Sequence, residues 1–304
     1  MKFGVHLPQW GPLATRDAVL AVVEAIEGCG LDSAWVADHV VYPSAGAERY
    51  PYSTDGTPFR PEDGFLEAFA TLALAAAATT RIALGTSALV LPMREPLLTA
   101  KSVATLDVLS GGRVILAVGG GWWREEFDAL GAPFHRRAQR LDESIQIMRA
   151  LWSRGSADHQ GEVFSFDELA CEPRPLQPGG PPIWIAAAGA AARRRAARLG
   201  DGWHPIGLRA EQLRAGCSEI DQIARAAGRD PDEIGLSTVM GVSCDPARAG
   251  ERLVELARAG VRHVVLIVRG DSIRERCAAI EQLASEVVPA VRRELAGSPG
   301  AREA

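Results

Sequence analysis

Short, mainly apolar runs alternate along almost the entire chain with longer stretches in which apolar residues recur at helical spacing. Runs such as ILAV at 115–118 and VVLIV at 264–268 are continuously apolar, as is typical of strands buried on both faces of a parallel sheet. The repetition of strand and amphipathic helix predicts an α/β protein with a (β/α)8 TIM barrel. The eight expected strands are 3–7, 34–37, 82–90, 114–118, 183–187, 202–206, 236–242 and 264–268.

Helical segments separate these strands, and several carry start and stop signals. Thr15 is a candidate N-cap for the first helix, and Gly28 and Gly30 mark its end. Pro96 stands at an early position of the third helix, where proline is favoured. The expected helices are 16–28, 67–79, 96–109, 139–152, 190–199, 210–227, 246–259 and 273–295.

Two connections are too long for simple turns and predict insertions after strand 2 and before strand 5. The first, 40–64, is rich in proline and holds all three tyrosines, so it is either a substrate lid or a packed excursion or dimer contact. The second, 153–182, predicts a hairpin around 162–172 with a structural role. We expect a single domain over 1–296 and a disordered tail over 297–304.

Composition disfavours several classes of function. The 304 residues are 47% hydrophobic and carry a net charge of −5, so the chain lacks the basic footprint of a nucleic-acid-binding protein. Five scattered cysteines form no CxxC pair, and the N-terminus enters a strand without a basic region followed by an apolar run. We therefore expect a cytoplasmic protein with neither a membrane nor a nucleic-acid partner.

In such a barrel the chemistry lies at the carboxyl ends of the strands. A Schiff-base aldolase needs a lysine there, but Lys2 and Lys101, the only lysines, lie elsewhere. A metal centre needs clustered ligands, and His6 stands alone on the first strand, so a metal hydrolase is a remote alternative and no metal is expected. The strand ends offer instead His6, Trp10, Asp38, His39, Thr86, Ser87, Ala88, Gly119, Gly120, Gly121, Trp122, Ala187, Ala188, Gly189, Trp203 and His204. Small residues and tryptophans suit a flat organic cofactor that carries the reaction.

His39 is the main candidate for the chemistry. It follows a buried strand and adjoins Asp38, and an imidazole exchanges protons near neutral pH. Asp38 would either tune and position His39 or make an ordinary hydrogen bond at the strand end. For His6 and His204 both a functional and a structural interpretation stay open.

The start of the helix 190–199 is a candidate phosphate site. Ala188 and Gly189 open this helix, and its free N–H groups and dipole favour an anion. Gly119–Gly121 after the fourth strand is a weaker signal, because glycine often merely turns a strand into a loop.

Four segments of the chain read FGVHLP, LDSAWVADHVVYP, TRIALGTSALVLPMREPLLTAKSVATLDVLSGGRVILAVGGGWWREEFDALG and PPIWIAAAGAAARRRAARLGDGWHPIG. Together they resemble the bacterial luciferase-like superfamily, and within it the branch assigned to the deazaflavin coenzyme F420. Relatives with the same barrel use FMN, which is the alternative cofactor. The resemblance also implies a homodimer and a possible flavin or F420 reductase as redox partner.

The resemblance implies roles for individual positions. His39 would lie beside the reactive ring of the cofactor, and Ser87-Ala88 would form a non-proline cis peptide that bulges towards it. The implied cofactor contacts are His39, Thr86, Ser87, Ala88, Gly119, Gly120, Gly121, Ala187, Ala188 and Gly189. From the strand-end residues themselves we predict a substrate pocket of His6, Trp10, Tyr42, Trp122, Trp203 and His204, and we predict His39 and Asp38 as the catalytic residues.

Departures from the pattern bear on the substrate. Sugar-phosphate dehydrogenases of this superfamily carry a catalytic glutamate directly after the strand-four glycines, where this chain has Trp122. Their tryptophan after the strand-two histidine is replaced by Tyr42-Pro43, and Glu125 and Glu126 are expected only to begin the next helix. These differences favour a small hydrophobic or aromatic substrate over a sugar phosphate.

The resulting hypothesis is an oxidoreductase that transfers a hydride between coenzyme F420 and such a substrate. One alternative is an FMN-dependent monooxygenase that uses O2 and a separate flavin reductase. Another is a non-catalytic protein that binds or sequesters a flavin.

Overall fold

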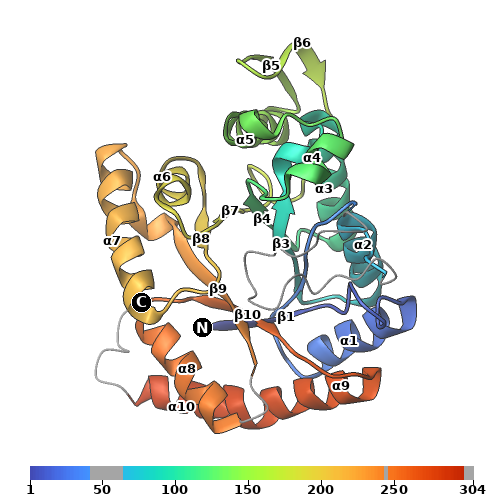
Figure 1. Cartoon of the computed structure of the whole chain (residues 1–304), viewed down its shortest axis with the longest axis vertical. Helices are drawn as coiled ribbons and strands as arrows, with labels where there is room; N and C mark the ends of the chain where they lie inside the picture. The colour runs from blue at the N-terminus through green and yellow to red at the C-terminus, as the bar shows by residue number, and fades with distance from the viewer. Residues whose placement is uncertain (42–63, 243–245, 298–304) are drawn as a thin grey trace.

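A computed structural model describes residues 1–41, 64–242 and 246–297, and in these ranges eight parallel strands close into a barrel (Figure 1). Around the barrel the order of the strands is β1-β2-β3-β4-β7-β8-β9-β10, with β10 pairing back to β1. The predicted (β/α)8 barrel is confirmed. The strands are β1 (Lys2–His6), β2 (Ser33–Val36), β3 (Ala83–Val90), β4 (Val114–Gly119), β7 (Ile183–Ala186), β8 (Gly202–His204), β9 (Gly235–Gly241) and β10 (His263–Ile267).

Helices surround the barrel at the predicted places, and α4 is an additional short helix outside the predicted ranges. They are α1 (Arg16–Gly28), α2 (Ala68–Ala78), α3 (Pro96–Ser110), α4 (Arg124–Ala129), α5 (Arg137–Arg154), α6 (Ala190–Leu199), α7 (Ala210–Ala226), α8 (Pro246–Arg258), α9 (Ile273–Gln282) and α10 (Val288–Ala296). Short 3-10 turns lie at Leu91–Met93, Phe134–Arg136 and Pro231–Glu233. The hydroxyl of Thr15 caps α1 by accepting the amide of Ala18 at 3.2 Å, as the sequence predicts.

The last predicted helix, 273–295, is interrupted by a π-helical turn, Leu283–Val287, between α9 and α10. Pro289 follows that turn. Because proline has no amide hydrogen and its ring collides with the preceding turn, the regular hydrogen-bond ladder changes there. None of the helices in the described ranges has the length and apolar character needed to cross a membrane.

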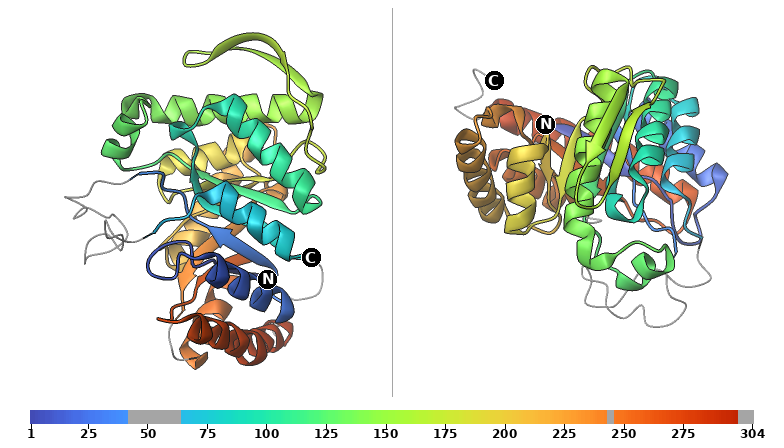
Figure 2. Two further views of the ribbon diagram at one scale, coloured as in Figure 1. Left: turned by 90° about the vertical axis from the view of Figure 1, so that its right-hand side faces the viewer. Right: turned by 90° about the horizontal axis from the view of Figure 1, so that it is seen from above.

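The insertion before the fifth barrel strand forms an antiparallel hairpin of β5 (Ser156–Gln160) and β6 (Ser165–Ala170). It lies against α5 and arches over the outside of the barrel (Figure 2). The hairpin starts earlier than predicted, because the polar sequence SADHQ gives no apolar strand signal. Most of the insertion after strand 2, with Tyr42, and most of the 297–304 tail lie outside the described residues.

Trp35 of β2 fills the inside of the barrel and is fully buried with Ala117 and Val265. A Cβ atom on Gly85 would lie 2.3 Å from Cε3 of Trp35, and one on Gly4 would lie 2.4 Å from its Nε1. These two strand positions must therefore be glycine for the indole to fit. A second, larger apolar core lies between the strands and the surrounding helices.

Candidate active site

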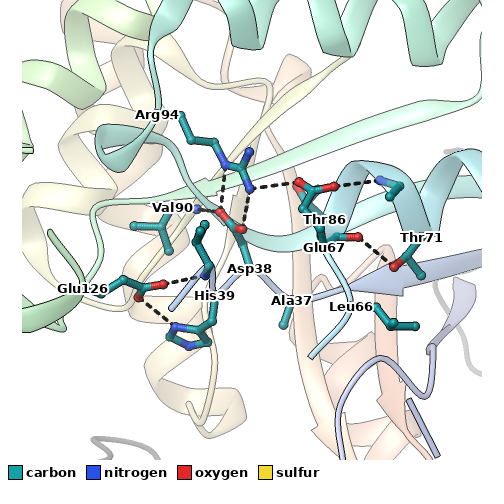
Figure 3. Close-up of polar contacts among 12 residues, drawn as sticks. Ala37, Asp38, His39, Leu66, Glu67, Thr71, Thr86, Val90, Arg94 and Glu126 are labelled. Atoms are coloured by element: carbon teal, nitrogen blue, oxygen red, sulfur yellow. Dashed lines mark hydrogen bonds and ion pairs between the residues drawn. The ribbon is translucent and has the colours of Figure 1, made fainter. Parts of the chain in front are cut away.

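His39, which follows β2, is hydrogen-bonded to a buried carboxylate (Figure 3). Its Nδ1 lies 2.9 Å from Oε2 of Glu126, a residue of α4 whose side chain is only 2% exposed. The other oxygen, Oε1, accepts the amide hydrogen of Val40 at 2.7 Å. A carboxylate only accepts hydrogen bonds, so Nδ1 carries a proton and the opposite ring nitrogen, Nε2, faces away from Glu126.

Aromatic rings surround the imidazole of His39. Phe65, Trp122 and Trp123 all contact it edge to face, with ring centroids 5.6, 6.1 and 5.7 Å away. Trp122 stacks on Trp123, and Phe65 stacks on Trp10 of the loop after β1. Predicted pocket residues Trp10 and Trp122 are therefore gathered around His39, in an apolar setting that disfavours water.

Asp38, predicted to position His39, points the other way (Figure 3). Its carboxylate accepts two hydrogen bonds from Arg94, at 2.7 and 3.2 Å, and one from the amide of Val90 at 2.9 Å. Burial lowers the pKa of the Arg94 guanidinium, but the carboxylates of Asp38 and Glu67 outweigh this effect and raise it. Because successive residues of an extended segment face opposite sides, Asp38 ties the end of β2 to the end of β3 and does not contact His39. Of the two interpretations that the sequence left open, the hydrogen-bonding role at the strand end is the one observed.

The bulge expected at Ser87-Ala88 is present. The pairing of β3 with β4 shifts register between Thr86 and Leu89, and the Ser87–Ala88 peptide is cis. Thr86, a predicted cofactor contact, is instead fully buried and donates its hydroxyl to the carbonyl of Ala117 at 2.8 Å. That side chain lies within the sheet and does not reach the mouth.

Small residues line the mouth beside the bulge. A Cβ on Gly119 would lie 3.7 Å from that of Ala88 and 3.9 Å from that of Ala186, and one on Gly120 would meet nothing within 4 Å. Gly121 has a φ of 71°, and an added Cβ there would lie 2.6 Å from Phe127. The strand-four glycines thus keep this side of the mouth free of side chains.

The segment before α6 is held in an unusual backbone shape. Ala187 has a φ of 135°, and its carbonyl accepts the indole hydrogen of Trp203 at 2.8 Å. Arg193 donates to the carbonyl of Ala188 at 2.6 Å. Gly189 is the N-cap of α6, and no side chain caps that end of the helix among the described residues. No capping side chain from the described ranges therefore occupies the first-turn amides of α6. An anion site at a helix N-terminus needs such available N–H groups.

Trp203 and His204 were predicted to line the substrate pocket, with a structural interpretation of His204 left open, and both side chains are buried. Trp203 is 1% exposed and belongs to the outer core, where a Cβ on Gly216 of α7 would lie 2.3 Å from its ring. His204 is fully buried inside the barrel, stacked on Trp35 at 5.7 Å. Neighbouring residues of a strand face opposite sides, so only one of them could have faced the interior.

Three histidines inside the barrel are buried and neutral. Burial lowers the pKa of His6 to about 4, and burial followed by the charge of neighbouring groups lowers those of His204 and His263 to about 3. His6 is 7% exposed, contacts Trp10 edge to face at 5.2 Å, and its Nδ1 has no hydrogen-bond partner in the described part of the chain.

These shifts predict that acid destabilises the fold. Between pH 6.5 and about 4 these histidines are protonated in the unfolded state but stay neutral in the folded state. Because the unfolded state then binds more protons, the free energy of unfolding falls as the pH falls. The loss by pH 5 is about 2 kcal/mol for each histidine. Urea unfolding at pH 7 and pH 5 measures it. In His263→Gln the free energy of unfolding should depend less steeply on pH, whereas substitution of the exposed His135 should leave this dependence unchanged. The same dependence on pH in both variants would contradict the prediction.

Sequence reasoning missed Glu126 and Phe65 as members of the site, whereas Trp123 follows Trp122 directly at the predicted end of the fourth strand. Glu126 was expected only at a helix start, and it does lie in the first turn of α4. The available signal was its place just beyond the strand-four glycines, at the catalytic face. No group of three or more potential metal ligands occurs within the residues the structure describes.

The luciferase-like monooxygenase family model matches residues 1–294, and the chain belongs to this family. A protein of Mycobacterium tuberculosis without an assigned function is 34% identical over 228 residues, 74% of this chain and 78% of that protein. An F420-dependent glucose-6-phosphate dehydrogenase of Amycolatopsis mediterranei is 36% identical over 200 residues, 64% of this chain and 54% of that protein. An FMNH2-dependent dimethylsulfone monooxygenase of Pseudomonas putida is 32% identical over 137 residues, 44% of this chain and 38% of that protein.

The fold is also that of a solved F420-dependent secondary alcohol dehydrogenase in complex with an F420–acetone adduct. The TM-score is 0.78 at 20% identity, over 96% of this chain and 99% of that chain. The chain is therefore a luciferase-like oxidoreductase that depends on F420 or a flavin.

Proposed function

We propose that this protein transfers a hydride between coenzyme F420 and a small hydrophobic or aromatic organic substrate. The observation that carries the proposal is the pair formed by half-buried His39, just after β2, and buried Glu126, next to aromatic rings. One positioned acid–base group in an apolar pocket suits a reaction in which the cofactor carries the hydride and the protein handles a proton.

The residues at the mouth fit a flat cofactor with an anionic side chain. Gly119 and Gly120 leave a surface without side chains next to Ala88, which gives a planar ring access to the backbone. The segment Ala187–Gly189 and the N-terminus of α6 would hold the phosphate. When bound, the cofactor would accept or supply the hydride.

The chain's own residues would handle the proton and exclude water. Glu126 binds Nδ1 of His39, so Nε2 is the nitrogen that would give a proton to the substrate or take one from it. Trp10, Phe65 and Trp122 would receive an apolar substrate beside this nitrogen. The position after the glycines is Trp122 and not a carboxylate, which supports an apolar substrate over a sugar phosphate.

A binding titration separates the two cofactors. The purified protein is titrated anaerobically with F420 and with FMN, each oxidised and reduced, and the affinity is read from fluorescence and absorbance. We expect F420 to bind at least tenfold more tightly than FMN, a difference of about 1.4 kcal/mol. Tighter binding of reduced FMN, with oxygen-dependent turnover, would establish the monooxygenase alternative.

A turnover assay separates an enzyme from a flavin-binding protein. Small aliphatic and aromatic alcohols, ketones and unsaturated carbonyl compounds are tested with the bound cofactor, and its absorbance is followed. We expect turnover with at least one apolar member of this panel. Tight binding of the cofactor without any turnover would favour a sequestering protein.

A further inference from the structure

A hydrogen-bonded chain of three side chains lies beneath the bulge of β3. The hydroxyl of Ser87 lies 2.8 Å from Nε2 of His204, and Nδ1 of His204 lies 2.8 Å from the hydroxyl of Ser237. The three residues come from β3, β8 and β9, and their exposed fractions are 7%, 0% and 2%. A polar chain of this kind, sealed from solvent, links the mouth of the barrel to its interior.

The imidazole of His204 is fixed in this chain. A neutral histidine has one donor and one acceptor nitrogen, and here each nitrogen is used by one serine hydroxyl. Its ring also lies almost parallel to that of Trp35, at 10° and 5.7 Å, which restricts rotation of the side chain. Trp35 is itself fitted against Gly4 and Gly85.

Ser87 needs such support because the sheet does not supply it there. The register of β3 against β4 shifts between Thr86 and Leu89, so regular strand pairing is interrupted at the bulge. The position of Ser87 and Ala88 then depends on side-chain contacts, and the hydroxyl of Ser87 makes one to the rigidly held His204.

We propose that His204, backed by Ser237, is a positioning residue that holds the Ser87–Ala88 bulge at the depth at which the cofactor rests on it. The inference rests on the proposed function, in which the cofactor binds against this bulge. His204 does not touch the cofactor and acts through Ser87.

A double-mutant cycle tests this coupling in the full-length protein. His204→Phe keeps a flat ring on Trp35 but removes both nitrogens, and Ser87→Ala removes the hydroxyl. Each is expected to weaken the binding of F420, or of FMN if that binds better, by about tenfold, the value of one buried hydrogen bond. The double variant should bind the cofactor no more weakly than the single variant with the lower affinity, because each substitution removes the same Ser87–His204 hydrogen bond. Additive losses, or unchanged affinity in His204→Phe, overturn the proposal.

Two further variants guard against a merely structural effect. Ser237→Ala leaves the imidazole in place and should weaken binding in the same direction by about two- to fivefold. Thr238→Val is the matched control. Thr238 is next to Ser237 and equally buried, but its hydroxyl donates at 2.8 Å to the carbonyl of Pro205. It should lower the melting temperature and leave the affinity unchanged; an equal loss of affinity in this control counts against the proposal.

Amide hydrogen exchange in the cofactor-free protein gives a readout that does not depend on the cofactor. His204→Phe should raise exchange at 87–90 by about tenfold without a similar rise in β1 and β10. If the wild-type protein binds neither cofactor but this rise occurs, the proposed function fails and the support of the bulge stands. If the cofactor binds and exchange at the bulge is unchanged, the inference about His204 fails by itself.

Discussion

Replacing His39 with alanine is expected to lower turnover by about 10²- to 10⁴-fold, the contribution of a positioned acid–base group. The substitution removes the nitrogen that would exchange the proton and leaves the carboxylate of Glu126 with only backbone partners. Cofactor affinity should stay close to that of the wild type, because the glycines of 119–121 and the start of α6 are not altered. Steady-state kinetics with the best substrate of the panel and a cofactor titration measure the two quantities separately.

Substitution of His135 by alanine is the matched control for this experiment. His135 is exposed on a 3-10 turn of the same protein, so its loss should change neither quantity. Wild-type turnover in His39→Ala would remove His39 from the mechanism. A loss of cofactor affinity as large as the loss of turnover would instead show that His39 belongs to the cofactor-binding site.

The barrel could be predicted because strands such as β4 and β10 are almost continuously apolar and alternate with amphipathic helices, a pattern set by burial on both faces of the sheet. The hairpin of β5 and β6 could be placed only approximately. Its residues are mostly exposed, and hydrophobic periodicity carries no information where nothing is buried. The strand β8 ends at His204, earlier than predicted, because Pro205 has no amide hydrogen to continue the ladder.

The strand ends correctly indicated which segments meet at the mouth, but not which way each side chain faces. Trp203 faces the outer core and His204 the interior, and Asp38 and His39 diverge in the same way. A shift of one residue in the expected alternation exchanges the two faces. The alternation along β8 would have excluded one member of the pair Trp203 and His204 from the pocket, although the sequence alone does not say which.

Side-chain contacts between residues far apart in the sequence could not be predicted from the pattern of apolar and polar residues. Asp38 binds Arg94, 56 residues away, and His39 binds Glu126, 87 residues away. Such contacts depend on where α3 and α4 start against the barrel, which local propensity does not determine. Glu126 therefore looked like an ordinary acidic residue of a first helical turn, where carboxylates are common for electrostatic reasons.

Replacing Glu126 with glutamine is expected to lower turnover by roughly 10- to 100-fold, less than the loss of His39 itself. Both oxygens of the carboxylate accept hydrogen bonds, one from Nδ1 of His39 and one from the amide of Val40. Glutamine has the same shape but only one acceptor, so it must present an NH2 group to one of these donors. The imidazole then loses its fixed tautomer or its orientation, and Nε2 is no longer held for the substrate.

Glu125→Gln is the matched control, because Glu125 precedes Glu126 in the same turn of α4 but is exposed. The kinetic comparison should show a fall in kcat for Glu126→Gln, little change in the KM for the cofactor, and wild-type values for Glu125→Gln. A positioning role also predicts that the double variant His39→Ala/Glu126→Gln is no slower than His39→Ala, since Glu126 acts only through the imidazole. If the double variant loses activity in proportion to both single losses, Glu126 contributes to the reaction independently of His39, and the assignment of a single proton-exchanging group at this site is wrong.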